Sequence, residues 1–282
     1  MTIRGHSVTT TTRRTRPRPA DLLRPDDHGI ERADWSEIGP TFIRSWGWPR
    51  GKRECEHLSC YGRTRAGKST FVLWALNARY HAHGSHCVAL ATKRTDHMLA
   101  DSGWPIVDHW PPGYGHDRCI YWAKAKGISR SFRAPQRQKC KELLDALWVP
   151  DSNIVFYVDE IPYVTMDLGL KTELDTFYRE GAGNGITMVS SQQRPAGTSR
   201  YTHSEPGWTV SFKPKDQDDC KRIAEVFGDR QRYMAALMSL DSYKREFLIK
   251  SDILDLAYIS HLPDLSARVS GRSGRGVHSA QR

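Results

Sequence analysis

The sequence predicts an α/β fold, with a mostly parallel central sheet flanked by helices. Two observations support this prediction. The apolar segment 57–61 leads through a glycine-rich turn into the apolar helical run 69–76. A second apolar strand, residues 153–158, ends in Asp159 and Glu160. Units in which a strand, a turn and a helix follow each other build parallel sheets, and the residues after such strands meet at one rim of the sheet.

Composition limits the class of protein. The chain of 282 residues is long enough for one large domain with appendages. Its net charge of +10 suggests a polyanionic partner. No apolar run approaches the ~18 residues of a membrane span, and the first residues lack the apolar stretch of a secretory signal. The six cysteines include no C-x-x-C pair and are typical of reduced thiols, so we expect a cytoplasmic protein.

Composition also divides the chain into four parts. These are a basic disordered arm, a short helical lead-in, a large α/β domain and a basic Ser/Gly/Arg-rich disordered tail, at residues 1–34, 35–54, 55–263 and 264–282. The two ends contain too few large apolar residues to fold alone, and they either contact phosphates or are inert. In the lead-in, Ile38, Phe42 and Trp46 recur every four residues, which predicts an amphipathic helix.

Residues 58–70 contain Gly62-x-x-x-x-Gly67-Lys68-Ser69, a complete P-loop pattern. A loop that cradles phosphates turns bare backbone N–H groups inward, and glycine permits this turn because a Cβ atom would block it. Lys68 can then reach the β- and γ-phosphates of ATP, and the Ser69 hydroxyl can hold Mg²⁺. The residues expected to contact the nucleotide are Gly62, Arg63, Thr64, Arg65, Ala66, Gly67, Lys68, Ser69 and Thr70.

The apolar strand 153–158 and the acidic pair that follows it form a Walker B pattern. Asp159 would hold the Mg²⁺ ion directly or through water, and Glu160 would act as the general base that activates the attacking water. The 90 positions from Ser69 to Asp159 leave room for at least one more strand. Together the two motifs predict an enzyme that converts ATP and water to ADP and phosphate.

Apolar runs and their breaks predict the remaining elements. We expect strands at residues 87–93, 119–125, 186–192 and 209–213, and a last strand at 246–250. We expect helices at residues 134–148, 167–179, 216–227 and 231–240. A polar residue at the tip of strand 186–192 could sense the γ-phosphate. The amide of Gln192 or Gln193 suits this role, because an amide can donate to phosphate and also orient water.

Three segments in this order carry a resemblance to a known family. They are residues 62–69, Val158-Asp159-Glu160, and residues 185–195 with the sequence Gly-Ile-Thr-Met-Val-Ser-Ser-Gln-Gln-Arg-Pro. The last segment resembles the Gly-Ile…Thr-Gln-x-Pro stretch of the FtsK–HerA superfamily, which includes chromosome-pumping translocases and viral genome-packaging ATPases. The resemblance covers residues 55–250. It implies a RecA-like core, a hexameric ring around DNA, and ATP bound at each subunit boundary opposite an arginine finger of the neighbour.

The chain departs from the family at the arginine finger. Many members carry Gly-Arg-x-x-Gly-Ile before the sensor strand, whereas residues 181–186 of this chain have Ala182 in place of the arginine. Arg179 lies three residues earlier and can substitute, as can Arg194 or Arg200. The long membrane and linker regions of cell-division translocases are absent from this sequence. A compact phage, plasmid or mobile-element motor in a bacterial or infected host cell therefore fits the resemblance better.

We therefore predict an ATP-driven motor that translocates or packages double-stranded DNA and does not read its sequence. Two alternatives remain open. A nucleoside or small-molecule kinase would explain the P-loop, but it has no need of Glu160 and would produce a phosphorylated acceptor instead of free phosphate. In a nucleotide-switch assembly protein, ATP binding closes an interface and hydrolysis is incidental, so the substitution Glu160→Gln would leave its function largely intact.

Overall fold

The structure, a computed structural model, describes residues 28–47, 55–93, 96–112, 117–124, 127, 130–195 and 197–262. Within these residues the strands form a single ten-stranded sheet in the order β1-β10-β9-β8-β2-β7-β6-β3-β5-β4. The expected basic tail, most of the expected basic arm and the end of the lead-in lie outside the described residues. Among the helices that the structure describes, none is long and apolar enough to cross a membrane.

The strands are β1 (Glu31–Arg32), β2 (Leu58–Tyr61), β3 (His86–Ala91), β4 (Ile106–Val107), β5 (Arg118–Trp122), β6 (Ile154–Asp159), β7 (Ile186–Gln192), β8 (Trp208–Phe212), β9 (Phe247–Ser251) and β10 (Leu256–Ser260). The α-helices are α1 (Trp35–Gly47), α2 (Lys68–His83), α3 (His97–Ala100), α4 (Arg133–Leu147), α5 (Lys171–Glu180), α6 (Tyr201–Ser204), α7 (Gln217–Phe227) and α8 (Arg230–Ser239).

The middle of the sheet is parallel. All neighbouring strands from β8 through β2, β7, β6, β3 and β5 to β4 pair in parallel. β9 runs antiparallel to both β8 and β10. The carboxyl ends of β2, β3, β6 and β7 therefore lie at one rim, the rim at which open α/β sheets bind ligands. The predicted fold class, a mostly parallel sheet flanked by helices, is confirmed.

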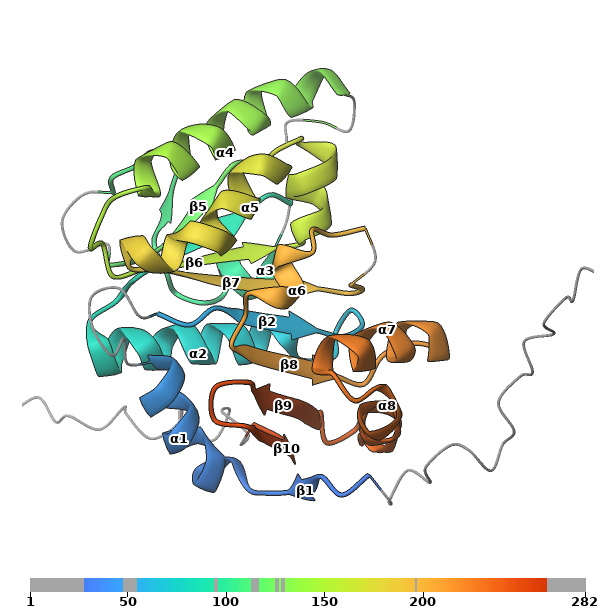
Figure 1. Ribbon diagram of the computed structural model, residues 1–282. Helices are drawn as coiled ribbons and strands as arrows, with labels where there is room; N and C mark the ends of the chain where they lie inside the picture. Colours follow the sequence, from blue (N-terminus) through green and yellow to red (C-terminus); the bar gives the residue numbers. More distant parts are fainter. Residues whose placement is uncertain are drawn as a thin grey trace, which may run out of the picture.

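Helices cover both faces of the sheet (Figure 1). Alternate side chains of β3 point to opposite faces. Cys87 and Ala89 belong to the core formed with α1 and α2, and Val88 and Leu90 belong to the core formed with α4 and α5. A third core joins α7 and α8 to β9 and β10. Because both faces are buried, the central strands are nearly continuous apolar runs rather than alternating ones.

The lead-in helix α1 packs an aromatic face on the sheet. Trp35, Phe42 and Trp46 are buried. The ring centroid of Phe42 lies 5.1 Å from that of Trp46 and 5.0 Å from that of Trp208 on β8. The four-residue spacing seen in the sequence thus produces a helix with one buried face, and this helix is part of the main core.

Three short strands were not expected from the sequence. β10 follows β9, so the prediction that the strand at residues 246–250 is the last one is wrong. β4 lies in a segment without an apolar pattern, and β1 lies within residues 1–34, which were expected to form a disordered arm. In β1, Glu31 pairs with Tyr258 and Arg32 pairs with Ile259. β1 and β4 have only two residues each, and strands this short have no pattern that residue propensity could reveal.

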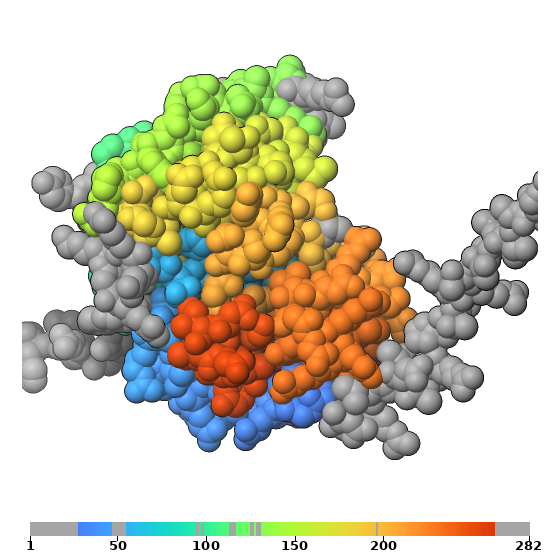
Figure 2. Space-filling view, in the orientation of Figure 1, coloured from blue at the N-terminus to red at the C-terminus, as the bar shows by residue number. Residues whose placement is uncertain are grey.

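The two ends of the described chain meet at one edge of the sheet. In Figure 2 the blue residues near the N-terminus lie beside the orange-red residues of the C-terminal strands, and the green residues of α4 lie at the far end of the molecule. Ser260 Oγ donates to Ala33 O at 2.8 Å, and Arg32 Nε donates to Glu246 Oε1 at 3.3 Å. These contacts attach the N-terminal segment to β9 and β10.

His57, which precedes β2, is buried in its neutral form. Its Nε2 donates to Tyr178 O at 2.9 Å, and its Nδ1 accepts from Met188 N at 3.0 Å. Burial lowers the pKa of His57 from 6.5 to about 4. The cause is that a protonated ring would lose its hydration and also the acceptor at Nδ1. Between these two pH values the unfolded chain binds a proton that the folded chain excludes.

We expect the free energy of unfolding to fall as the pH decreases from 6.5 towards 4. The contribution of His57 is on the order of 3 kcal/mol. His57→Gln keeps a donor but cannot take up the proton, so its stability should depend less steeply on pH in this window. Urea unfolding followed by tryptophan fluorescence at several pH values measures the slope of the free energy of unfolding against pH. The matched control is His81→Gln, at an exposed position on α2. A slope for His57→Gln equal to that of the wild type would contradict this assignment.

Candidate active site

The turn between β2 and α2 packs against Phe212, the last residue of β8. Gly62 and Gly67 have φ angles of 139° and 117°, a region that side chains rarely adopt. A Cβ atom on Gly62 would lie 2.8 Å from Phe212 Cβ, and one on Gly67 would lie 2.9 Å from Phe212 Cε1. Glycine at these two positions therefore lets the loop turn and lie directly against β8.

The N-terminus of α2 has no side-chain cap. Gly67 occupies the N-cap position, and the first turn contains no acidic residue. By contrast, the Asp216 side chain caps α7 by accepting from Asp219 N, and the Asp229 side chain caps α8 by accepting from Arg232 N. The first N–H groups of α2 are thus left for an anion, which the positive end of the helix dipole would also favour.

Lys68 lies over the phosphate loop. Its Nζ donates to Gly62 O at 2.7 Å and to Arg63 O at 3.1 Å. Burial lowers the pKa of the Lys68 ammonium. Two carbonyl groups of the loop therefore hold this cation beside the uncapped helix end, where it can exchange them for phosphate oxygens.

The acidic pair follows β6, and buried hydroxyl groups hold its first member. Asp159 Oδ1 accepts from Ser191 Oγ at 2.6 Å and from Tyr157 OH at 3.2 Å. Ser191 lies beside Asp159 in the pairing of β7 with β6, and its carbonyl oxygen accepts from Glu160 N at 3.1 Å. Ser191 therefore orients both acids. Ser191 could not be recognised from the sequence, because its role depends on the register of two strands.

Lys93 supplies the counter-charge of the acidic pair. It follows β3, which pairs with β6 on the side opposite to β7, and its Nζ lies 2.7 Å from Asp159 Oδ2 and 3.0 Å from Glu160 Oε1. Partial burial alone would lower the pKa of the Lys93 ammonium, but the attraction of the two carboxylates outweighs burial and raises this pKa. In the sequence, Lys93 stands at the end of the expected strand 87–93, and no motif there points to its role.

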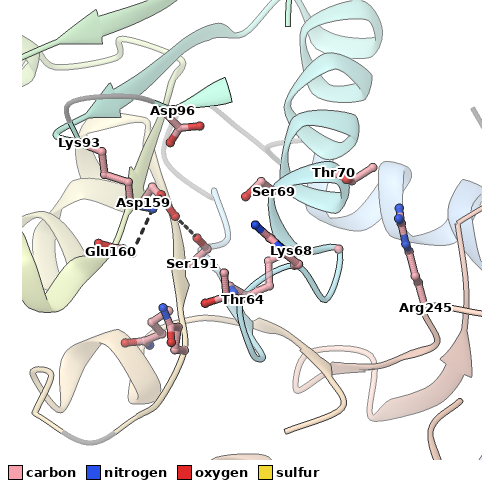
Figure 3. A pocket seen from close by; sticks show the side chains of 14 residues that line it. Thr64, Lys68, Ser69, Thr70, Lys93, Asp96, Asp159, Glu160, Ser191 and Arg245 are labelled. Atoms are coloured by element: carbon pink, nitrogen blue, oxygen red, sulfur yellow. Dashed lines mark hydrogen bonds and ion pairs between the residues drawn. The ribbon is translucent and has the colours of Figure 1, made fainter. Parts of the chain in front are cut away.

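These groups line one cleft of about 500 Å³ (Figure 3). Its lining residues are Thr64, Arg65, Gly67, Lys68, Ser69, Thr70, Lys93, Asp96, Asp159, Glu160, Ser191, Gln192, Gln193 and Arg245. The structure thus brings the P-loop and the acidic pair to the same cleft, with β7 between β2 and β6. Gly62, Arg63 and Ala66 were also expected to contact the nucleotide. They shape the loop but do not line the cleft.

The two candidate sensor glutamines differ in exposure. Gln192 is 1% exposed, whereas Gln193 lies at the surface. Both residues line the cleft at the end of β7. Gln193 is therefore the amide with more freedom to reach a ligand, and Gln192 belongs to the floor of the cleft.

The three arginines considered as fingers do not line the cleft of their own chain. Arg179 on α5 pairs with Glu180 at 3.0 Å. Arg194 lies 3.3 Å from Asp219 at the start of α7, and Arg200 is exposed just before α6. A residue that acts on a neighbouring subunit does not need to line its own cleft, so this arrangement is compatible with such a role for each of them.

Arg245 marks the end of the cleft that is opposite to the acidic pair. In Figure 3 it lies beyond Thr70, while Lys93 and Glu160 lie on the other side of the P-loop. Its loop precedes β9 and is closed by a hydrogen bond from Glu246 N to Asp241 O at 3.0 Å. No motif surrounds Arg245 in the sequence, and only the addition of β9 to β8 brings it to this position.

The fold is similar to that of viral genome-packaging ATPases. The genome packaging NTPase B204 of Sulfolobus turreted icosahedral virus 2, in complex with AMPPCP, gives a TM-score of 0.53 at 14% identity over 74% of this chain and 98% of that chain. Its complex with AMP gives 0.52 at 15% identity over the same shares. B204, the DNA-packaging ATPase of Sulfolobus Turreted Icosahedral Virus, gives 0.53 at 16% identity over 74% of this chain and 97% of that chain.

No protein-family model and no curated protein matches the sequence. At identities of 14% to 16%, the likeness to these solved structures shows the fold alone. The described chain therefore shares the fold of these genome-packaging NTPases, and the predicted α/β architecture is confirmed.

Proposed function

We propose that the chain is an ATP-hydrolysing motor that translocates or packages double-stranded DNA. The observation that carries this proposal is the convergence of Lys68, Ser69, Asp159 and Glu160 on one cleft. A phosphate loop beside a metal-binding acid and a general base suits the hydrolysis of a nucleoside triphosphate. The net charge of +10 and the DNA-packaging ATPases that share the fold support DNA as the polymer.

The groups in the cleft fit ATP with a magnesium ion. The uncapped N-terminus of α2 and the Lys68 ammonium suit a chain of phosphates. The Ser69 hydroxyl and the Asp159 carboxylate are oxygen ligands, which Mg²⁺ prefers. Held by these two groups, Mg²⁺ would neutralise part of the charge on the β- and γ-phosphates.

In the proposed reaction, Glu160 accepts a proton from a water molecule while the water oxygen bonds to the γ-phosphorus. The bond between the γ-phosphorus and the oxygen that bridges it to the β-phosphorus breaks, and its electron pair leaves with ADP. Lys68 stabilises the negative charge on the phosphates. Gln193 orients the water or contacts the γ-phosphate, with Gln192 as the alternative. The products are ADP and phosphate.

We propose a homo-oligomeric ring, a hexamer as in the resembling family, with DNA in its channel. A neighbouring copy would then supply an arginine finger to each cleft. Arg179 is the first candidate, because its pair with Glu180 is solvent-exposed and such pairs contribute little stability. Arg194 is less free, because it pairs with Asp219, whose side chain is 7% exposed. Arg200 is exposed and remains the third candidate.

We expect ATP hydrolysis to accelerate severalfold with long duplex DNA and more weakly with short duplexes, because a motor couples turnover to movement along the polymer. Phosphate release measured against DNA length tests this, with light scattering as the readout of ring formation. Equal rates with and without long DNA would reject the motor and leave an ATPase. A phosphorylated acceptor in place of free phosphate would indicate a kinase.

Glu160→Gln should lower kcat by about 10²- to 10⁴-fold, the range typical for loss of a general base. ATP affinity should stay close to that of the wild type, because the P-loop is unchanged. Phosphate release and fluorescent-nucleotide binding measure the two effects separately. The control is Glu142→Gln on the exposed face of α4. A Glu160→Gln variant with wild-type kcat would assign the role of base to another residue.

Arg245→Ala should weaken ATP binding by about tenfold or more, since a charge-assisted hydrogen bond is worth roughly 1.5–3 kcal/mol. The effect should fall on Kd rather than on kcat, because Arg245 lies away from Glu160 (Figure 3). Fluorescent-nucleotide titration measures it. Arg230→Ala is the matched control, an exposed arginine that pairs with Glu225 outside the cleft. An unchanged Kd would remove Arg245 from the site.

A further inference from the structure

A single ammonium group holds both acids of the proposed reaction. Lys93 Nζ lies 2.7 Å from Asp159 Oδ2 and 3.0 Å from Glu160 Oε1. Three neighbouring strands contribute to this arrangement, because β3 leads to Lys93, β6 ends in Asp159 and β7 carries Ser191. Lys93 thereby fixes the separation of the two carboxylates and neutralises one of their two negative charges.

Of the two carboxylate oxygens of Asp159, Oδ2 is the one whose hydrogen-bond partner can change. Its Oδ1 accepts from the buried hydroxyl groups of Ser191 and Tyr157, at 2.6 Å and 3.2 Å. Its Oδ2 accepts from Lys93, whose side chain is 38% exposed. A metal ion or metal-bound water that approaches Asp159 from the cleft must therefore use Oδ2. Lys93 and a divalent cation are alternative partners of the same oxygen.

Lys93 and a divalent cation cannot both remain at Asp159 Oδ2, because both are positively charged. Two carboxylates in a partly buried site repel each other, and the Lys93 ammonium offsets that repulsion. A divalent cation at Oδ2 would offset it more strongly and would also repel the ammonium. A cation alone gains only the contact with the acids, whereas a cation carried by a nucleotide also gains the binding free energy of the P-loop. The nucleotide complex is therefore the ligand able to displace Lys93.

We propose that Lys93 is a switch residue of this site. It holds Asp159 and Glu160 until a metal–nucleotide complex enters, and it then releases Asp159 Oδ2 to the metal ion. Until that release, the ion pair with Lys93 keeps Glu160 from acting as a base. The inference rests on the proposed function, because it requires Asp159 to be a metal ligand. It adds a regulation, namely that the site rejects a divalent cation that arrives without a nucleotide.

Binding of Mn²⁺ to the nucleotide-free protein tests this proposal, with the electron paramagnetic resonance signal of free Mn²⁺ as the readout. Lys93→Met keeps the aliphatic stem and removes the charge, so it should bind Mn²⁺ about tenfold more tightly than the wild type, or tighter still. Lys93→Arg restores the cation and should bind as weakly as the wild type. Adding Asp159→Asn to Lys93→Met should abolish the gain in Mn²⁺ affinity, because this gain depends on the Asp159 carboxylate.

The matched control is Lys124→Met, which removes the same charge from an exposed lysine that lies 4.7 Å from the Trp122 ring and contacts neither acid. It should leave Mn²⁺ affinity unchanged. Circular dichroism checks the fold of each variant, and Lys93→Gln replaces Lys93→Met if the latter fails to fold. An Mn²⁺ affinity of the uncharged variant no greater than that of the wild type would overturn the proposal and make Lys93 a structural ion pair. The proposal would also be overturned if Lys93→Met still raised the Mn²⁺ affinity in a protein that carries Asp159→Asn.

This test is independent of the motor activity. Mn²⁺ binding to the nucleotide-free protein requires neither hydrolysis nor DNA. If hydrolysis is not stimulated by DNA, the motor is rejected while the comparison of Lys93 variants still decides the switch. If the variants bind Mn²⁺ equally, the switch is rejected while the motor stands.

Discussion

The hydrogen bond between Ser191 and Asp159 joins the two halves of the site. Parallel pairing places Cys60, Ser191 and Asp159 side by side on β2, β7 and β6. β7 therefore sets the distance between the phosphate loop that follows β2 and the acids that follow β6. A slip of one residue in this register would turn Ser191 to the opposite face and leave Asp159 Oδ1 without its shortest contact. The chemistry of the cleft thus depends on strand pairing as much as on either motif.

Asp159 tolerates burial because donors from different strands surround it. Its side chain is 12% exposed, and a carboxylate so placed would be costly without partners. Burial and then the charge of Asp159 raise the pKa of Tyr157, so its hydroxyl keeps the proton that it donates. Two of the partners, Tyr157 and Ser191, are buried and fixed, and the third, Lys93, is half-exposed. Oδ1 of Asp159 therefore has fixed hydrogen-bond partners, whereas the partner of Oδ2 can be exchanged.

The two motifs could be predicted because each is a continuous segment whose spacing itself encodes the geometry. The P-loop glycines require positive φ angles, and the acidic pair ends a strand with a continuous apolar pattern. Lys93, Ser191 and Arg245 could not be predicted, since their positions follow from the pairing of strands that lie far apart in the sequence. β1 was missed for a related reason, because its two residues, Glu31 and Arg32, carry no apolar pattern and pair only with β10.

The P-loop and the Arg245 end of the cleft are attached to one pair of aromatic rings. Phe212 supports the P-loop glycines, and its ring centroid lies 5.4 Å from that of Phe247 on β9. Arg245 precedes Phe247 by two residues and lines the far end of the cleft. Because close-packed interiors transmit displacement, a shift of the P-loop against Phe212 would also move Phe247 and Arg245. The antiparallel edge of the sheet is for this reason part of the candidate nucleotide site, although neither nucleotide motif lies in it.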